Sequence, residues 1–201
     1  MLNYKKQPYN SVWVWADSQD ELGITFMRFQ EYYESSNPDF RGKVFTQGQL
    51  RKWYSEHYGG NNYHKHWVGF NFPSTVLEPF KSGLFDPLTK EEAELLNLFR
   101  YREDKFYIIG SQDDSVLRHE LSHALYFHNP KYKQDIDSFI NKNKKKLQKT
   151  IKYILTKGYC EEVLYDEIQA YITDNQDAEI INNTCQSVIT GINQIYKKYT
   201  K

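Results

Sequence analysis

Residues 115–127 constrain this chain most, because their pattern fits one folded form, a helix that is buried along one side. Asp113, Asp114 and Ser115 are favourable N-cap residues, and Asn129-Pro130 is a stop signal. Between these signals, apolar residues recur at helical spacing, at Val116, Leu117, Leu121, Ala124 and Leu125. The segment is therefore predicted to be an amphipathic helix that packs on the rest of the protein.

Two histidines and a glutamate lie in the middle of this helix, in the order His119-Glu-Leu-Ser-His123. A helix turns by about 100° per residue, so the two imidazoles lie one turn apart on the same side and can reach one ion. Neutral imidazoles suit zinc, and Glu120 can take a proton from a metal-bound water. An ordinary helix with two surface histidines is the weaker alternative, because Arg118 and Ser122 already serve as the polar face.

The composition predicts one compact unit with two lobes. The 201 residues include 17 Tyr, 12 Phe and 4 Trp, which is ample for a core.

Basic and acidic side chains number 26 each, so no overall field attracts nucleic acid or anionic lipid. No apolar run has the length of a membrane span, and the first residues lack the apolar core of a secretory signal. Cys160 and Cys185 fit a reducing compartment. We expect an intracellular, cytoplasmic protein without nucleic-acid or membrane partners.

Residues 1–104 are predicted to form a helical and aromatic N-terminal lobe that packs on the catalytic part. Ser18 with Glu21, and Thr46 with Gln49, fit the capping-box pattern of helix starts. Helices are expected at about residues 19–34, 47–58 and 89–100. The aromatic, turn-rich residues 61–88 either line a wall near the active site or pack in the core.

Residues 105–201 are predicted to form the catalytic core and the C-terminal helices. Residues 105–110 have the β-branched and aromatic content of a strand. A long helix, straight or kinked, is expected at 130–157 and another helix at 161–172. On the latter, Glu167 lies at helical spacing among apolar residues, where an unpaired carboxylate would cost several kcal/mol. A metal ion would remove that penalty.

Together these residues resemble the zincin metallopeptidases, and the gluzincin branch in particular. The resemblance covers about residues 105–174. It implies that His119, His123 and Glu167 bind one zinc ion per chain and that Glu120 is the catalytic base. It also implies a zincin-like α+β fold, mostly helical, with a small mixed sheet. The edge strand of that sheet would precede the His-Glu-x-x-His helix and pair with an extended peptide substrate.

The resemblance is incomplete around the third ligand. Thermolysin-like members place Asn directly before that ligand and Asp four residues after it, where this chain has Asp166 and Tyr171. Asp166 or Asp174 is a candidate to orient a ligating histidine, with surface charge as the alternative. Tyr165 and Tyr171 are candidates to hydrogen-bond the tetrahedral oxyanion, although core packing is the simpler explanation for either tyrosine.

His128 is the rival third ligand. It follows His119 by nine residues, which on a continuous helix turns it to the opposite side, so only a chain reversal at Asn129-Pro130 could bring it back. The metzincin pattern would require glycine at position 126 and histidine at position 129, where this chain has Tyr126 and Asn129. That branch does not fit.

Metal-assisted hydrolysis is the expected chemistry. Three protein ligands leave one position for water, and Glu120 would pass the proton of that water to the leaving amine. The expected function is therefore a zinc-dependent metallopeptidase that acts on a peptide or protein substrate. Two alternatives stay open. One is a zinc hydrolase of non-peptide amides or esters, which would use the same residues. The other is a binding or scaffold module with a structural or inactive zinc site.

Overall fold

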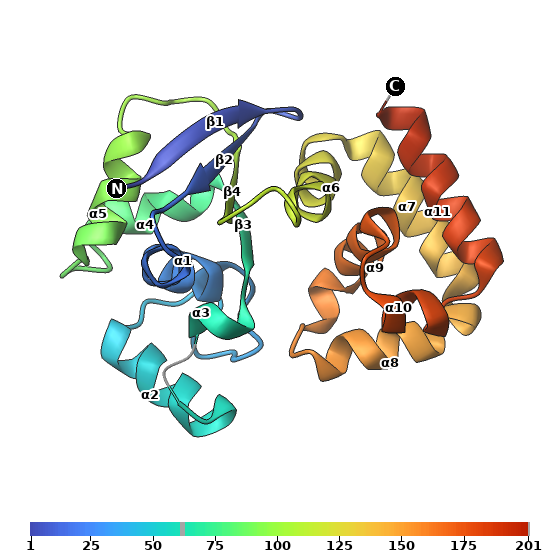
Figure 1. Ribbon diagram of the computed structural model, residues 1–201, viewed down its shortest axis with the longest axis horizontal. Helices are drawn as coiled ribbons and strands as arrows, with labels where there is room; N and C mark the ends of the chain where they lie inside the picture. The colour runs from blue at the N-terminus through green and yellow to red at the C-terminus, as the bar shows by residue number, and fades with distance from the viewer. Residues whose placement is uncertain (61–62, 201) are drawn as a thin grey trace. The chain divides into compact units, whose positions relative to one another are not determined.

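A computed structural model describes residues 1–60 and 63–200 of the chain. The chain divides into two units, Met1–Leu117 and Arg118–Lys201 (Figure 1). The protein is α+β and mostly helical, with a small mixed sheet of four strands in the part that is described. This confirms the expected class, whereas its zincin-like character stays a prediction.

The sheet belongs to the first unit and has the strand order β1-β2-β4-β3. Its strands are β1 Asn3–Gln7, β2 Ser11–Trp15, β3 Gly69–Pro73 and β4 Tyr107–Ser111. β2 and β4 are parallel, whereas β1 pairs with β2, and β3 with β4, in the antiparallel sense. Tyr9 and Asn10 connect β1 to β2 with φ of 57° and 47°, the positive values that a tight type I′ hairpin turn requires.

The prediction that an edge strand precedes the histidine helix is wrong. β4 lies between β2 and β3, and all five of its residues are buried. Its main-chain groups pair with a strand on either side, so no extended peptide can be added to it. The physical reason is that Tyr107, Ile108 and Ile109 suit a strand covered on both faces, and the two flanking strands were not predicted from the sequence.

Helix α1, Gln19–Glu34, contacts β3 and β4. A Cβ atom at Gly110 of β4 would lie 2.6 Å from Cζ of Phe26, so glycine permits this close packing. Further elements of the first unit are α2 Gln47–Tyr58, α3 Tyr63–His66, a 3-10 turn at Ser74–Leu77, α4 Glu78–Lys81 and α5 Lys90–Leu98. The three helices expected in this region are present as α1, α2 and α5.

Local capping explains where these helices begin. Complete capping boxes join Thr46 to Gln49 at α2 and Thr89 to Glu92 at α5. At α1, Ser18 accepts a hydrogen bond from the backbone of Glu21, but the Glu21 carboxylate accepts from the amide of Asp17 instead of closing the box. Helix α1 therefore starts at the expected residue, but only one of the two capping-box hydrogen bonds forms.

A buried ion pair lies among the aromatic residues of the first unit. Arg28 of α1 donates to Glu92 of α5 through Nε, at 2.6 Å, and through Nη2. It also donates to the carbonyl oxygen of Phe85 at 2.9 Å. The two charged side chains are 2% and 0% exposed. Of the aromatic segment 61–88, residues 61–62 lie outside the described part, and the rest supplies rings to this core, at Tyr63, Phe70, Phe72, Phe80 and Phe85.

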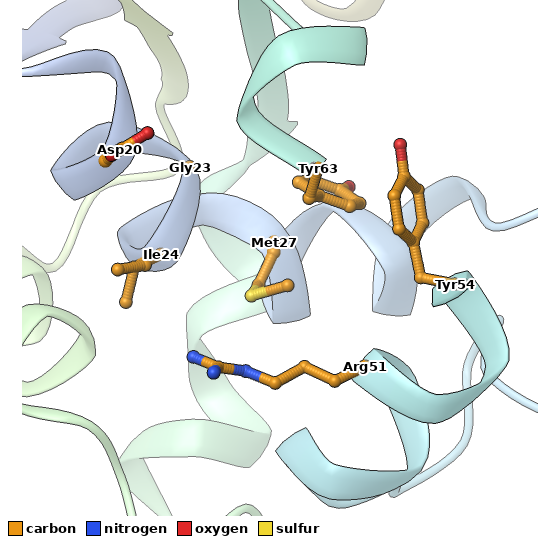
Figure 2. A pocket seen from close by; sticks show the side chains of 7 residues that line it. All are labelled: Asp20, Gly23, Ile24, Met27, Arg51, Tyr54 and Tyr63. Carbon is orange, nitrogen blue, oxygen red and sulfur yellow. The ribbon is translucent and has the colours of Figure 1, made fainter. Parts of the chain in front are cut away.

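A pocket of about 180 Å³ opens between α1 and α2 (Figure 2). One face of α1 contributes residues at helical spacing, and α2 and α3 supply the opposite wall. The lining residues are Asp20, Gly23, Ile24, Met27, Arg51, Tyr54 and Tyr63.

Among the described residues of the second unit, all regular secondary structure is helical. Its elements are α6 Leu117–His128, α7 Pro130–Asn143, α8 Gln148–Thr156, α9 Leu164–Asp174, α10 Ala178–Asn183 and α11 Gln186–Tyr199. Short 3-10 turns at Lys144–Leu147 and Glu161–Val163 lead into α8 and α9. α9 contacts α7, α8, α10 and α11 (Figure 1). The long helix expected at 130–157 is thus divided at Lys144–Leu147.

Within residues 1–60 and 63–200, each helix is too short or too polar to cross a membrane. Cys160 and Cys185 do not form a disulfide bond.

We predict that Glu92→Gln lowers the free energy of unfolding by about 3–5 kcal/mol, because it leaves the Arg28 charge buried without its counterion. Glutamine can still complete the capping box at α5, so the loss reports on the ion pair. Urea unfolding measures the change, with the half-buried neighbour Glu91 changed to Gln as the matched control. Equal effects of the two substitutions would contradict the prediction.

Candidate metal centre

Helices α6 and α9 bring three potential metal ligands together within the second unit. His119 and His123 come from α6 and Glu167 from α9. The two histidine Nε2 atoms lie 3.2 Å apart. The Glu167 carboxylate oxygens lie 3.8 Å from Nε2 of His119 and 3.7 Å from Nε2 of His123. Nitrogen ligands of a tetrahedral zinc ion are about 3.3 Å apart. The group could therefore hold one metal ion.

Small side chains hold the two helices close together. The hydroxyls of Ser122 on α6 and Thr173 on α9 lie 2.8 Å apart and form a hydrogen bond. Both side chains have no exposed surface. Ser122 directly precedes His123, so this contact fixes the turn of α6 that carries the second histidine.

Burial shifts the pKa values of His119 and Glu167 in the direction that favours the uncharged form of each side chain. Burial, the charge of His123 and the charge of Lys157 hold the pKa of His119 well below 6.5, which keeps one ring nitrogen unprotonated and available to a metal. Burial also raises the pKa of Glu167 to about 8, against the attraction of His123. A metal ion would favour the charged form of this carboxylate.

Asp166 contacts the ring nitrogen of His123 that is not part of the ligand group. Nδ1 of His123 lies 2.8 Å from Oδ1 of Asp166, so Nδ1–H donates to the carboxylate and Nε2 is left for the ligand group. Burial favours the neutral ring, but the charges of Asp166 and Glu167 raise the pKa of His123 well above 6.5. Asp166, which the sequence offered as a candidate to orient a ligating histidine, therefore contacts His123.

Glu120 lies beside the group. Its side chain is 4% exposed, in the first turn of α6. Its charge contributes to raising the pKa of both His123 and Glu167. This is a suitable position for the predicted general base.

Two tyrosines contact the group from α9 and from the turn before it. The Tyr171 ring packs edge-on against His119, with centroids 4.5 Å apart. Its hydroxyl lies 3.0 Å from that of Tyr159. Tyr159 also hydrogen-bonds Glu167, which lowers the pKa of that carboxyl. Tyr159 was not predicted from the sequence, because its approach to Glu167 depends on the turn at Gly158, where φ is +97°.

The remaining candidates lie elsewhere in the second unit. Tyr165 lines a pocket of about 400 Å³ between α7, α8 and the start of α9. Asp174 faces the charge of Arg118. His128 packs edge-on against Phe127 and is not a member of the ligand group found among the described residues.

Comparisons with protein-family models, with curated proteins and with solved structures gave no match for this chain.

We predict that Glu167→Gln stabilises the metal-free protein increasingly as the pH rises from about 4.5 to about 8. Below this range the carboxyl is protonated in both states. Within it, the unfolded chain ionises while the folded protein retains the proton, so the stability of the native sequence falls with rising pH. Glutamine removes this loss, which we expect to be on the order of a few kcal/mol.

Urea unfolding in a chelating buffer at about pH 5 and about pH 8.5 tests this prediction. A constant difference between the variant and the native sequence at both pH values would contradict it.

Proposed function

We propose that this protein is a zinc-dependent hydrolase, and specifically a metallopeptidase. The supporting observation is that ligand atoms of His119, His123 and Glu167 lie within 4.8 Å of one another in a buried group, beside Glu120. Three protein ligands are typical of catalytic zinc sites, which keep one position open, whereas structural sites use four. This observation favours the hydrolase over a scaffold module.

The donor set suits zinc. Two imidazoles and one carboxylate form a common ligand set for a catalytic zinc ion. When bound, zinc supplies a Lewis acid that polarises a carbonyl group and lowers the pKa of a coordinated water.

The residues around the ligand group would each have a separate role in the reaction. Glu120 is the general base: it accepts the proton of the attacking water and returns it to the leaving nitrogen. Asp166 keeps Nε2 of His123 directed at the metal. Tyr171 is the better placed of the two tyrosine candidates to donate a hydrogen bond to the developing oxyanion, because its ring touches His119.

A hydrolase of non-peptide amides or esters would use the same residues. Profiling against peptide libraries and against simple amides and esters distinguishes these substrates.

We predict about one zinc ion per chain and hydrolysis that depends on Glu120. Glu120→Gln should retain zinc and lower kcat by about 10²–10⁴-fold, because it removes the base and leaves the ligands in place. Elemental analysis and kinetic assays measure the two properties. Glu161→Gln, an exposed change in the 3-10 turn before α9, is the control and should leave both unchanged. A metal-free native protein, or full activity of Glu120→Gln, would refute the proposal.

We also predict that zinc raises the thermal midpoint of the native protein, because a ligand that binds only the folded state stabilises it. At a free zinc concentration of 100 times Kd the gain is about 2.7 kcal/mol. His123→Asn should lose this response, since it removes a ligand. Scanning calorimetry with zinc and with a chelator provides the test, and an equal response in both proteins would place the zinc elsewhere.

A further inference from the structure

A chain of hydrogen bonds leads from the core of the second unit to His123. The Tyr132 hydroxyl on α7 donates to Oε1 of Gln169 on α9, at 2.6 Å. Nε2 of Gln169 donates to Oδ1 of Asp166, at 3.0 Å. The same oxygen accepts from Nδ1 of His123, at 2.8 Å. Tyr132 and Gln169 have no exposed surface, and the Asp166 side chain is 18% exposed.

The direction of each bond follows from the Asp166 carboxylate, which can only accept. Gln169 therefore turns its amide nitrogen toward Asp166, which leaves Oε1 to accept from the Tyr132 hydroxyl. His123 likewise presents Nδ1–H to the carboxylate and keeps Nε2 for the ligand group. The chain thus selects one orientation of the imidazole.

The far end of the chain is fixed by packing. The Tyr132 ring lies edge-on to Tyr199, with centroids 5.5 Å apart, and near Tyr196, at 6.3 Å. Its backbone amide donates to the side chain of Asn129, which caps α7. Because Tyr132 cannot swing away, it can hold the Gln169 amide in one orientation.

We propose that Gln169 and Tyr132 are positioning residues that hold Asp166, and through it His123, in the geometry that binds metal. This inference rests on the proposed function, since it gives the chain a role toward the zinc ligand. The competing explanation is structural: the same bonds would merely join α7 to α9 and satisfy buried polar groups.

The first test is zinc affinity, measured by competition with a chelating dye. Gln169→Leu should weaken zinc binding by about tenfold or more, the usual effect of removing a group that supports a ligand. Tyr132→Phe removes one oxygen atom and should weaken binding by a smaller factor. Ile172→Val, a change of one methylene at a fully buried position of α9, is the matched control and should leave the affinity unchanged.

The second test needs no metal. In the zinc-free protein the Nδ1 proton of His123 should give a protected, downfield NMR signal, because it is hydrogen-bonded to a carboxylate in a buried site. His123→Asn assigns the signal. In Gln169→Leu and Tyr132→Phe the proton should exchange faster with water, whereas Ile172→Val should retain the native rate.

The outcomes separate the two explanations. Native zinc affinity and native proton exchange in both variants, with a lower thermal midpoint, would show a structural role and overturn the inference. If Gln169→Leu does not fold, Tyr132→Phe decides. A native protein that binds no zinc would refute the proposed function, and the exchange of the His123 proton would still decide whether the chain orients this ring.

Discussion

The second unit is organised around a carboxylate that has almost no access to water. Glu167 is 2% exposed, and burial raises its pKa to about 8. A fold selected for stability alone would place an apolar residue at such a position. Here the neighbouring helix instead presents His119 and His123, and a hydroxyl from Tyr159 supports the charged form. The site is therefore one place where the chain departs from ordinary burial rules, as functional sites do.

Much of the fold follows from signals confined to a few neighbouring residues. The boxes begun by Thr46 and Thr89 place the starts of α2 and α5 because their bonds close within one helical turn. The β1–β2 hairpin was not predicted, since Tyr9 is not a residue that usually marks a left-handed turn. The helix at 130–157 was expected to be straight or kinked, but the position of the division between α7 and α8 was not predicted, because a 3-10 turn keeps nearly the same apolar spacing as an α-helix.

Some residues of the site could likewise be predicted from the sequence, and others could not. His119 and His123 are brought together by the period of one helix, and Glu167 was singled out by its place in an apolar stripe. Gln169 could have been noticed, because it follows Asp166 at a spacing of three residues on one helix. Tyr132 and Tyr159 could not, since their contacts depend on how α7 and the turn at Gly158 meet α9.

Both edge strands of the sheet in the first unit carry features that discourage the addition of a further strand. Strand β1 forms one edge and exposes Lys5 and Lys6, whose charges discourage pairing with a strand of another molecule. At the opposite edge, the amide of Asn71 in β3 donates to the buried side chain of Gln30. Both features discourage the edge-to-edge aggregation to which open sheets are prone.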